Sequence, residues 1–381
     1  MRVLLATDGN LERQGICSFM LQWVEEFKSA PMLGNGVVIY FRKSIKDQEM
    51  AEAYQSLGAE LFSGNIPDSG TMTRSHYRSK IAKDIRGLLS ARKFDVVHIN
   101  SSAKGFTVTV LREAVRAGVP IRISHSHGRN NDCFIKRIYT FLFRLYIVHR
   151  ATLYAGCSVD AGLYMFGRPG INSKKWRFIP NTIDTEKYAF DEAARMLRRK
   201  ELKLSQDIKL VGAVGYLEEI KNHVFLLDVI LQLKKRGENT KLIVFGEGSL
   251  RELLEEKRAE LGIVGSVILY GVTDQIPQWL SAMDYYVMPS LSEGVPISAV
   301  EAQANGLPCL LSDRVPVDAD INADVYHLPI DKGPEPWIQM LIKLPRKSVQ
   351  ERKAGVDAVR QAGFDKKDTR KYIAELYAEK A

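Results

Sequence analysis

Two glutamates eight positions apart, Glu293 and Glu301, have the types and spacing that most clearly predict chemistry. Between them, Gly294 and Pro296 are expected to open a helix that follows a short apolar strand. The first turn of a helix offers backbone N–H groups and partial positive charge, which suit phosphate oxygens or sugar hydroxyls. A carboxylate on that helix can accept hydrogen bonds from two vicinal hydroxyls. The segment 293–301 therefore predicts a site for a ligand that carries phosphate and sugar groups.

The surroundings of Glu301 are expected to leave its carboxylate room to reach that ligand. The helix carries small side chains near Glu301, namely Ser298, Ala299 and Ala302. Gly294 has no side chain, so a ligand can approach the backbone there. The pair Asn305–Gly306 is typical of a helix end. The alternative is a solvated helical glutamate that follows an ordinary turn.

Lys221 lies in a predicted strand-to-helix loop, where it can meet phosphate groups. It follows the predicted strand 208–214 and Gly215, and apolar side chains at helical spacing come next. A cation at this turn can neutralise a diphosphate, on which negative charge grows as it leaves. The alternative is an ordinary surface lysine. Gly246–Gly248 favours a tight loop after the next strand, and with Arg251 in place of a third glycine it does not match the G-x-G-x-x-G of dinucleotide-binding proteins.

His125 and His127 end a predicted strand at alternate positions, so both side chains are expected to point to the same face. A neutral imidazole there can bond to a sugar hydroxyl. An H-x-H pair also suits a metal ion, but no third ligand occurs in a nearby motif. Arg129 follows directly and can meet a phosphate or an acceptor. The alternatives are buried structural histidines and a surface charge.

These residues resemble the retaining, nucleotide-sugar-dependent glycosyltransferases of family 4, which have the GT-B fold. Glu293 and Glu301 match the E-x7-E signature of that family. The further matches, in chain order, are Gln14-Gly15-Ile16, Ser124-His125-Ser126-His127, Ile179-Pro180-Asn181-Thr182-Ile183-Asp184, the segment 215–223 and Phe245-Gly246-Glu247-Gly248. Each motif is weak alone, but their order is specific. The resemblance runs over about residues 1–330 and is closest to enzymes that make capsules and exopolysaccharides.

The resemblance implies roles for individual residues. It assigns catalysis to His127, Lys221 and Glu293. The residues it assigns to the donor nucleotide sugar are Gly15, Gly215, Lys221, Gly246, Glu293, Gly294, Val295, Pro296 and Glu301. The residues it assigns to acceptor or sugar contacts are Gln14, His125 and Arg129. It implies a UDP-linked donor, a lipid-linked saccharide acceptor, and no metal or other cofactor.

Two features of the chain depart from the family pattern or compete with it. Tyr216 stands where the family usually has an arginine, so a second cation for the diphosphate is missing from that position. Asp318 and Asp320 imitate the D-x-D of metal-dependent enzymes with the GT-A fold, where two carboxylates hold a divalent ion. No other GT-A feature accompanies this pair.

Short apolar strands alternate with helical patterns, which predicts parallel α/β architecture. The predicted strands are 2–6, 37–41, 95–99, 121–125, 152–157, 208–214, 241–245, 267–270, 285–288 and 309–312. A charged helix is expected at 189–205. We expect the GT-B arrangement, with two Rossmann-like α/β domains that face each other across a cleft. The expected domains are an acceptor-binding domain at 1–182, a nucleotide-sugar domain at 183–363, and a C-terminal helix at 364–381 that crosses back to the first.

The net charge of +9 is concentrated in one part of the chain. Residues 74–150 contain sixteen Lys and Arg against four acids, so the rest of the chain is slightly acidic. Within this region, 132–150 is rich in apolar and aromatic residues with interspersed cations. That pattern is typical of a helix on an anionic membrane surface. The alternative is an internal helix whose charged ends reach solvent. No nucleic-acid-binding motif accompanies the basic surface.

Length and composition limit the possible number of domains and the kinds of protein that this chain can be. With 381 residues, 45% of them apolar, two domains with packed cores are expected. No signal peptide or membrane-spanning run is recognised, and four scattered cysteines fit a reduced, cytosolic protein. We therefore expect a glycosyltransferase of polysaccharide synthesis, peripheral on the inner face of the cell membrane. The alternatives are a GT-B nucleotide-sugar epimerase and a degenerate, non-catalytic scaffold.

Overall fold

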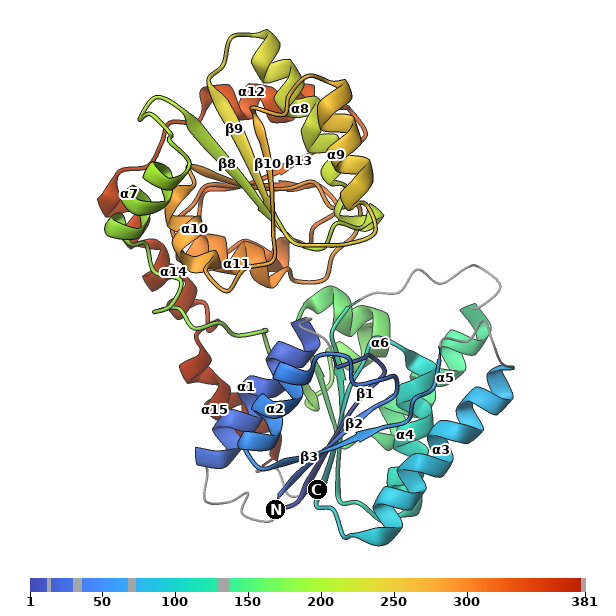
Figure 1. The fold of residues 1–381 in the computed structure, drawn as a ribbon. Helices are drawn as coiled ribbons and strands as arrows, with labels where there is room; N and C mark the ends of the chain where they lie inside the picture. Colours follow the sequence, from blue (N-terminus) through green and yellow to red (C-terminus); the bar gives the residue numbers. More distant parts are fainter. Residues whose placement is uncertain (12–14, 30–35, 68–72, 129–136, 378–381) are drawn as a thin grey trace. The chain divides into compact units, whose positions relative to one another are not determined.

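The computed structural model describes residues 1–381 except 12–14, 30–35, 68–72, 129–136 and 378–381 (Figure 1). The chain forms two compact units. Unit 1 comprises Met1–Thr182 and Lys366–Ala381, and unit 2 comprises Ile183–Asp365. Each unit contains one parallel sheet, and we describe each separately.

Unit 1 contains a seven-stranded parallel sheet in the order β3-β2-β1-β4-β5-β6-β7. The strands are β1 (Val3–Thr7), β2 (Val37–Phe41), β3 (Ala59–Ser63), β4 (Val96–Asn100), β5 (Ile121–Ser126), β6 (Leu153–Gly156) and β7 (Trp176–Phe178). The helices are α1 (Gly15–Ser29), α2 (Gln48–Ser56), α3 (Arg74–Ala91), α4 (Lys104–Arg116), α5 (Arg137–Arg150), α6 (Val159–Ile171) and α15 (Thr369–Tyr377).

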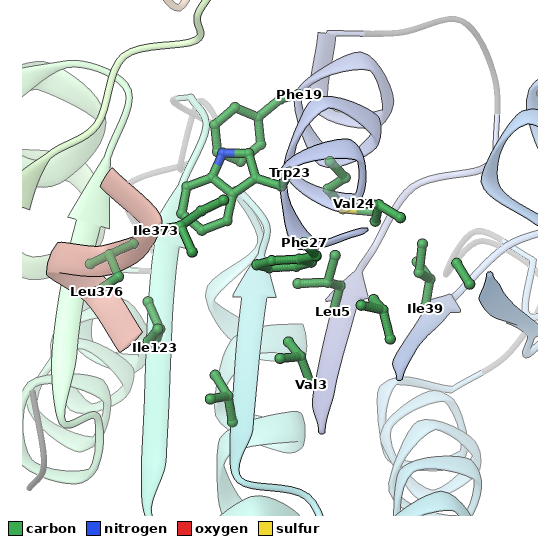
Figure 2. Packing of buried hydrophobic residues seen from close by; sticks show 14 of the residues in the cluster. Val3, Leu5, Phe19, Trp23, Val24, Phe27, Ile39, Ile123, Ile373 and Leu376 are labelled. Carbon is green, nitrogen blue, oxygen red and sulfur yellow. The ribbon is translucent and has the colours of Figure 1, made fainter. Parts of the chain in front are cut away.

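Helices cover both faces of the unit 1 sheet, which explains why β1, β2 and β4 are buried along their whole length. One face packs against α1, α2 and α15, and the other against α3, α4, α5 and α6. The helix α15 is thus part of the first core although it comes from the end of the chain. Its Ile373 lies beside Trp23 of α1, and its Leu376 belongs to the same buried cluster (Figure 2). The expectation that a C-terminal helix packs on the N-terminal domain is met by α15.

Unit 2 contains a six-stranded parallel sheet in the order β10-β9-β8-β11-β12-β13. The strands are β8 (Lys209–Val214), β9 (Thr240–Phe245), β10 (Val267–Gly271), β11 (Tyr285–Met288), β12 (Cys309–Ser312) and β13 (Val325–Leu328). The helices are α7 (Glu192–Glu201), α8 (His223–Lys235), α9 (Arg251–Glu260), α10 (Ile276–Ala282), α11 (Ile297–Ala304), α12 (Glu335–Lys343), α13 (Val349–Lys353) and α14 (Gly355–Gln361). One face packs against α10, α11 and α14, and the other against α8, α9 and α12.

The order of strands reverses next to the first strand of each sheet. In unit 1 this happens between β1 and β4, and in unit 2 between β8 and β11. Loops that leave the carboxyl ends of two such strands diverge and leave room for a ligand, which is why open α/β sheets bind ligands there. These two reversals are therefore the places where the predicted site residues must be sought.

The predicted fold class, two Rossmann-like parallel α/β domains, is confirmed, and each of the ten predicted strands is present within two residues. The strands β3, β7 and β13 were not predicted. β7 has only three residues, and β3 and β13 carry half-exposed side chains, so neither shows a long apolar run. The charged helix expected at 189–205 is shorter, because Asp191 caps it and Leu202 ends it.

Candidate active site

Lys221 and Glu293 form an ion pair at the strand reversal of unit 2. Lys221 ends a 3-10 turn, Glu219–Lys221, in the loop after β8, and Glu293 lies in the loop after β11. Lys221 Nζ donates to Glu293 Oε1 at 2.6 Å, and the two side chains are 20% and 12% exposed. Sequence reasoning placed both residues in ligand-facing loops, and the structure brings them into direct contact. A cation and a carboxylate thus form a hydrogen-bonded ion pair that is mostly shielded from solvent.

Backbone contacts hold these two loops together. The backbone N–H of Leu291 donates to the Ile220 carbonyl at 2.8 Å. Asn222 adopts a left-handed conformation, with φ of 55°, and its side-chain amide donates to the Pro289 carbonyl at 3.2 Å. Asparagine tolerates this conformation better than most residues. The Lys221 side chain is therefore presented from a fixed turn.

The helix that carries Glu301, α11, begins and ends where the sequence predicts. Pro296 is its N-cap, Asn305 ends it, and Gly306 follows with φ of 69°. The expected surface of small side chains around Glu301 is wrong in part. Ala299 and Ala302 are fully buried in the unit 2 core, because they point from α11 toward the sheet and not toward the Glu301 carboxylate.

Glu301 is instead surrounded by polar neighbours in a poorly solvated position. Burial raises the pKa of Glu301 to about 6, while a hydrogen bond from Tyr188 and the charge of Lys187 oppose this shift. Both Glu301 and Glu293 also help to raise the pKa of the buried Tyr286 phenol, after burial itself and despite its hydrogen bond with Ser298. The two carboxylates of the signature therefore act on one buried tyrosine.

Close backbone packing explains the glycines of the neighbouring loops. A Cβ atom on Gly246, which has φ of 133°, would lie 2.1 Å from the carbonyl oxygen of Gly215. A Cβ atom on Gly248 would lie 2.5 Å from the carbonyl oxygen of Leu217. No side chain fits at these distances, so the loops after β8 and β9 require glycine to pack together. This confirms a tight loop at Gly246–Gly248.

A ladder of polar side chains occupies the strand reversal of unit 1. We call it the histidine ladder; its members are His98, Asn100, His125 and His127. His98 Nε2 lies 3.2 Å from His125 Nδ1, and His127 Nε2 lies 2.9 Å from Asn100 Oδ1. The rings of His125 and His127 have centroids 4.1 Å apart, which confirms that both point to one face. Phe19 and Trp23 of α1 cover the ladder with edge-on aromatic contacts.

The histidines of the ladder are neutral. Burial lowers the pKa of His98 and of His127 to about 3 and that of His125 well below its ordinary value. The side chain of Asn100 also donates to the His98 carbonyl at 3.5 Å, which turns its oxygen toward His127. His127 Nε2 then carries the proton, and His127 Nδ1 keeps a lone pair that can accept a hydrogen bond.

The other predicted site residues have different outcomes. Gly15 is exposed and is the first residue of α1, at the reversal between β1 and β4. His125 is fully buried beneath His127. Tyr216, which replaces the usual arginine, is 44% exposed in the loop after β8. Gln14 and Arg129 lie outside the described residues. Gly294 and Val295 form the turn that leads from Glu293 into α11.

Sequence reasoning missed several neighbours of the site. His98 and Asn100 alternate along β4 just as His125 and His127 alternate along β5 and beyond, and this pattern was a usable signal. Tyr188 and Tyr377 gave no such signal, because both come from segments distant in sequence. Tyr188 approaches Glu301 from the start of unit 2, and Tyr377 approaches His98 from α15.

Among the described residues, no group of three or more His, Cys, Asp or Glu side chains is placed to hold a metal ion. Asp320 of the D-x-D pair contacts His327 Nε2 at 2.8 Å. In the same part of the chain, no helix has both the length and the apolar character needed to cross a membrane.

Known proteins are similar to this chain in sequence and in fold. The family described as "Glycosyl transferases group 1" matches residues 195–335. The putative glycosyltransferase EpsF of Bacillus subtilis is 30% identical over 82% of this chain and 81% of its own length. An Escherichia coli enzyme, UDP-Gal:alpha-D-GlcNAc-diphosphoundecaprenol alpha-1,3-galactosyltransferase, is 26% identical over 61% of this chain and 63% of its own length.

Solved structures show the same fold. Anabaena HepE in complex with UDP superposes with a TM-score of 0.78 over 99% of this chain and 100% of that one, at 16% identity. HepE in complex with UDP-glucose gives a TM-score of 0.72, with 99% of each chain covered, also at 16% identity. Together with the 30% identity to EpsF over most of both chains, the sequence match identifies the family. The chain belongs to the group 1 glycosyl transferases, enzymes with the GT-B fold.

Proposed function

We propose that this protein transfers a sugar from UDP to a saccharide carried on a polyprenyl diphosphate, with retention of the anomeric configuration, in polysaccharide synthesis. The observation that carries the proposal is the ion pair between Lys221 and Glu293 at the strand reversal of unit 2. Such a pair offers a cation to the leaving diphosphate and a carboxylate to the sugar. The Glu301 carboxylate nearby suits the two ribose hydroxyls.

The relatives support the choice of donor and acceptor. HepE has been solved with UDP and with UDP-glucose, and the Escherichia coli relative is named for a UDP-linked donor and an acceptor on diphosphoundecaprenol. EpsF and the Staphylococcus aureus protein CapJ, which is 27% identical over 44% of this chain and 41% of its own length, are further relatives. We carry UDP over from HepE and the Escherichia coli relative, and the lipid-linked acceptor from the Escherichia coli relative.

The reaction that we propose needs no covalent enzyme intermediate. The bond between the anomeric carbon and the diphosphate oxygen breaks, and the acceptor hydroxyl oxygen bonds to that carbon from the same face. The hydroxyl proton passes to the departing diphosphate oxygen. Lys221 stabilises the charge that grows on the diphosphate, and His127 Nδ1 accepts a hydrogen bond from a donor-sugar hydroxyl. Catalysis then depends on positioning and electrostatics.

We also propose that unit 1 meets an anionic membrane on the cytoplasmic side. On α5, Phe141, Leu142 and Leu145 are each more than half exposed. Their spacing puts them on one side of the helix, as on helices that lie in a membrane surface. Exposed cations occur on the neighbouring helices α3 and α4 as well as on α5, namely Lys80, Lys83, Arg86, Arg116 and Arg150.

Two observations limit how many cations can face lipid. Arg144, within the predicted membrane helix, donates instead to the carbonyls of Leu163 and Tyr164, so its guanidinium is held against α6. The buried Glu113 carboxylate pairs with Arg86, Arg112 and Arg116. We therefore assign the larger part of the attachment to the apolar side of α5, with anionic lipid as a secondary attraction.

A transfer assay tests the proposed function. The protein is incubated with each of a panel of UDP-sugars and with a synthetic polyprenyl-diphosphate-linked sugar, and products are weighed by mass spectrometry. We expect a glycolipid heavier by one sugar, UDP release, and an anomeric signal that matches the donor by NMR. A new sugar nucleotide formed from the donor alone would instead indicate an epimerase. No nucleotide binding, hydrolysis or transfer with any donor would favour a non-catalytic scaffold.

A further inference from the structure

The histidine ladder does not end within the sheet but continues to a tyrosine of the C-terminal helix. Tyr377 Oη lies 3.0 Å from His98 Nδ1, and His98 Nε2 lies 3.2 Å from His125 Nδ1. Each of these three side chains is at most 2% exposed. Two hydrogen bonds therefore run in series through a dry region, where a polar group without a partner is costly.

The proton count gives this series a direction. A neutral imidazole carries one N–H, so His98 can donate through only one of its two ring nitrogens. If Tyr377 donates to His98 Nδ1, His98 Nε2–H donates to His125 Nδ1, and His125 carries its proton on Nε2. The Ile179 backbone opposes the lowered pKa of His125, and His125 Nε2 has no hydrogen-bond partner among the described residues. In the opposite direction His98 Nδ1–H would donate to Tyr377 Oη, and among the described residues no other group is placed to accept the Tyr377 proton.

His127 depends on this arrangement through ring contact. Its ring is 4.1 Å from that of His125 and 4.9 Å from that of Phe19, measured between centroids, and its Nε2 is fixed by Asn100. Asn181 lies close enough to oppose the lowered pKa of His127. Even so, among the described residues neither His127 Nδ1 nor Asn181 Oδ1 has a hydrogen-bond partner. Each of these two buried atoms can accept a hydrogen bond from a hydroxyl group.

We propose that Tyr377 is a positioning residue: its hydroxyl sets the tautomers of His98 and His125, and so holds the His127 ring in the orientation that receives the donor-sugar hydroxyl. This inference rests on the proposed function of His127. It gives α15 a role beyond packing, because the helix delivers the hydroxyl that ends the series. Ile373 of the same helix packs beside Trp23, and Leu376 is buried in the same cluster (Figure 2).

Imidazole ¹⁵N NMR of the full chain tests the direction without any substrate. In the wild type we expect His98, His125 and His127 all as the Nε2–H tautomer, and in Tyr377→Phe a mixture of tautomers at His98 and His125. The phenylalanine keeps the ring contacts of Tyr377 with Trp23 and Phe27. A wild-type His98 with its proton on Nδ1 would overturn the direction, whatever the protein's activity.

Tyr54→Phe is the matched control. Tyr54 is fully buried in the same core, and its hydroxyl donates to the Cys17 carbonyl at 2.6 Å without touching a histidine. We expect both variants to lower the unfolding midpoint, but only Tyr377→Phe to lower kcat, by about threefold to tenfold, with the donor KM within about twofold. Equal kcat in the two variants, or a change in KM alone, would remove the positioning role.

The two proposals fail in distinguishable ways. If no donor is ever transferred, the proposed function fails, while the wild-type tautomers still show whether Tyr377 directs the series. If transfer occurs and Tyr377→Phe changes the tautomers without changing kcat, the proposed function stands and the positioning role is wrong.

Discussion

The two units place opposite chemistry at the same point of a similar fold. In unit 1 the strand reversal between β1 and β4 carries neutral imidazoles and amides, covered by aromatic rings of α1. In unit 2 the reversal between β8 and β11 carries a lysine paired with a carboxylate and a second carboxylate nearby. The topology thus fixes where a ligand can bind, and the loop residues fix which ligand. A neutral surface suits sugar hydroxyls, and a charged one suits a diphosphate.

Acid should lower the stability of unit 1 more than that of unit 2, and this is the largest effect that we expect. The three ladder histidines have folded pKa values below the unfolded value of about 6.5, so the unfolded chain binds more protons below that pH and stability falls. At pH 5.5 His98 and His127 each cost roughly 1 kcal/mol of stability, and His125 adds to this loss in unit 1.

In unit 2 two shifted groups, His223 and Glu301, have opposite effects on stability between pH 7.0 and 5.5. His223, with a pKa lowered to about 4, costs roughly 1 kcal/mol at pH 5.5, while Glu301, with a pKa raised to about 6, returns part of this as it is protonated. Hydrogen exchange with mass spectrometry at pH 7.0 and 5.5, corrected for the intrinsic rates, reads each unit separately. Equal losses in the two units would contradict the neutral ladder.

Loss of the lysine charge should remove most of the catalysis that we assign to unit 2. Lys221→Ala should lower kcat by about 10²- to 10³-fold, because the charge it opposes grows in the transition state. Lys221→Arg should keep part of the rate. Lys234 on α8, whose ammonium donates to the Gly262 carbonyl, provides the matched control as Lys234→Ala. A change in donor KM alone would show that Lys221 binds the ground state only.

Glu301 should show a conflict between binding and stability. Its raised pKa means that ionisation opposes folding, so the penalty is absent below about pH 4.5 and fully present above about pH 6. Glu301→Gln should therefore raise the free energy of unfolding at pH 7 by up to about 2 kcal/mol in urea titrations. It should also weaken UDP binding by about 1.5–3 kcal/mol in calorimetry. Lower stability, or an unchanged dissociation constant, would argue against the ribose role.

The smallest effect that we expect is on membrane binding, which we assign to the exposed apolar side of α5. Because α5 belongs to unit 1, changes on unit 2 should leave this binding unchanged. Phe141→Asp with Leu145→Asp should reduce binding to anionic liposomes by about tenfold in flotation assays. The matched control is Met196→Asp with Leu197→Asp on α7 of unit 2, where both side chains are also more than half exposed. Binding that is equal for both pairs, or absent in the wild type, would return α5 to a purely structural role.

Most of the fold was predictable from the sequence because most of its strands are buried on both faces and therefore appear as continuous apolar runs, unlike β3, β7 and β13. The loop motifs were predictable because glycine, proline and asparagine have local conformational causes, as at Gly246, Pro296 and Asn222. The contacts between side chains that support the site were not predictable from the sequence. Tyr377 reaches His98 across 279 positions, and no local pattern of the α15 sequence indicates which hydroxyl meets which ring.

The pairing of Lys221 with Glu293 was missed for a related reason. Lys221 and Glu293 are 72 positions apart, and each was assigned to its own loop, but their contact depends on β8 and β11 lying side by side. Sequence periodicity predicts that both strands exist and says nothing of their order in the sheet. The burial of Ala299 and Ala302 shows the same limit, since small residues on a helix suit a ligand surface and a tight core equally well.

Hydrogen exchange of the wild type with and without UDP tests the division of labour between the units most directly. We predict protection in unit 2 at the loop that carries Lys221, at the turn from Glu293 to Pro296 and along α11, and little change at His98 or His125. Lys221→Ala with Glu301→Gln should abolish this protection. Protection confined to unit 1, or none at saturating UDP, would contradict the assignment of the nucleotide to the charged site of unit 2.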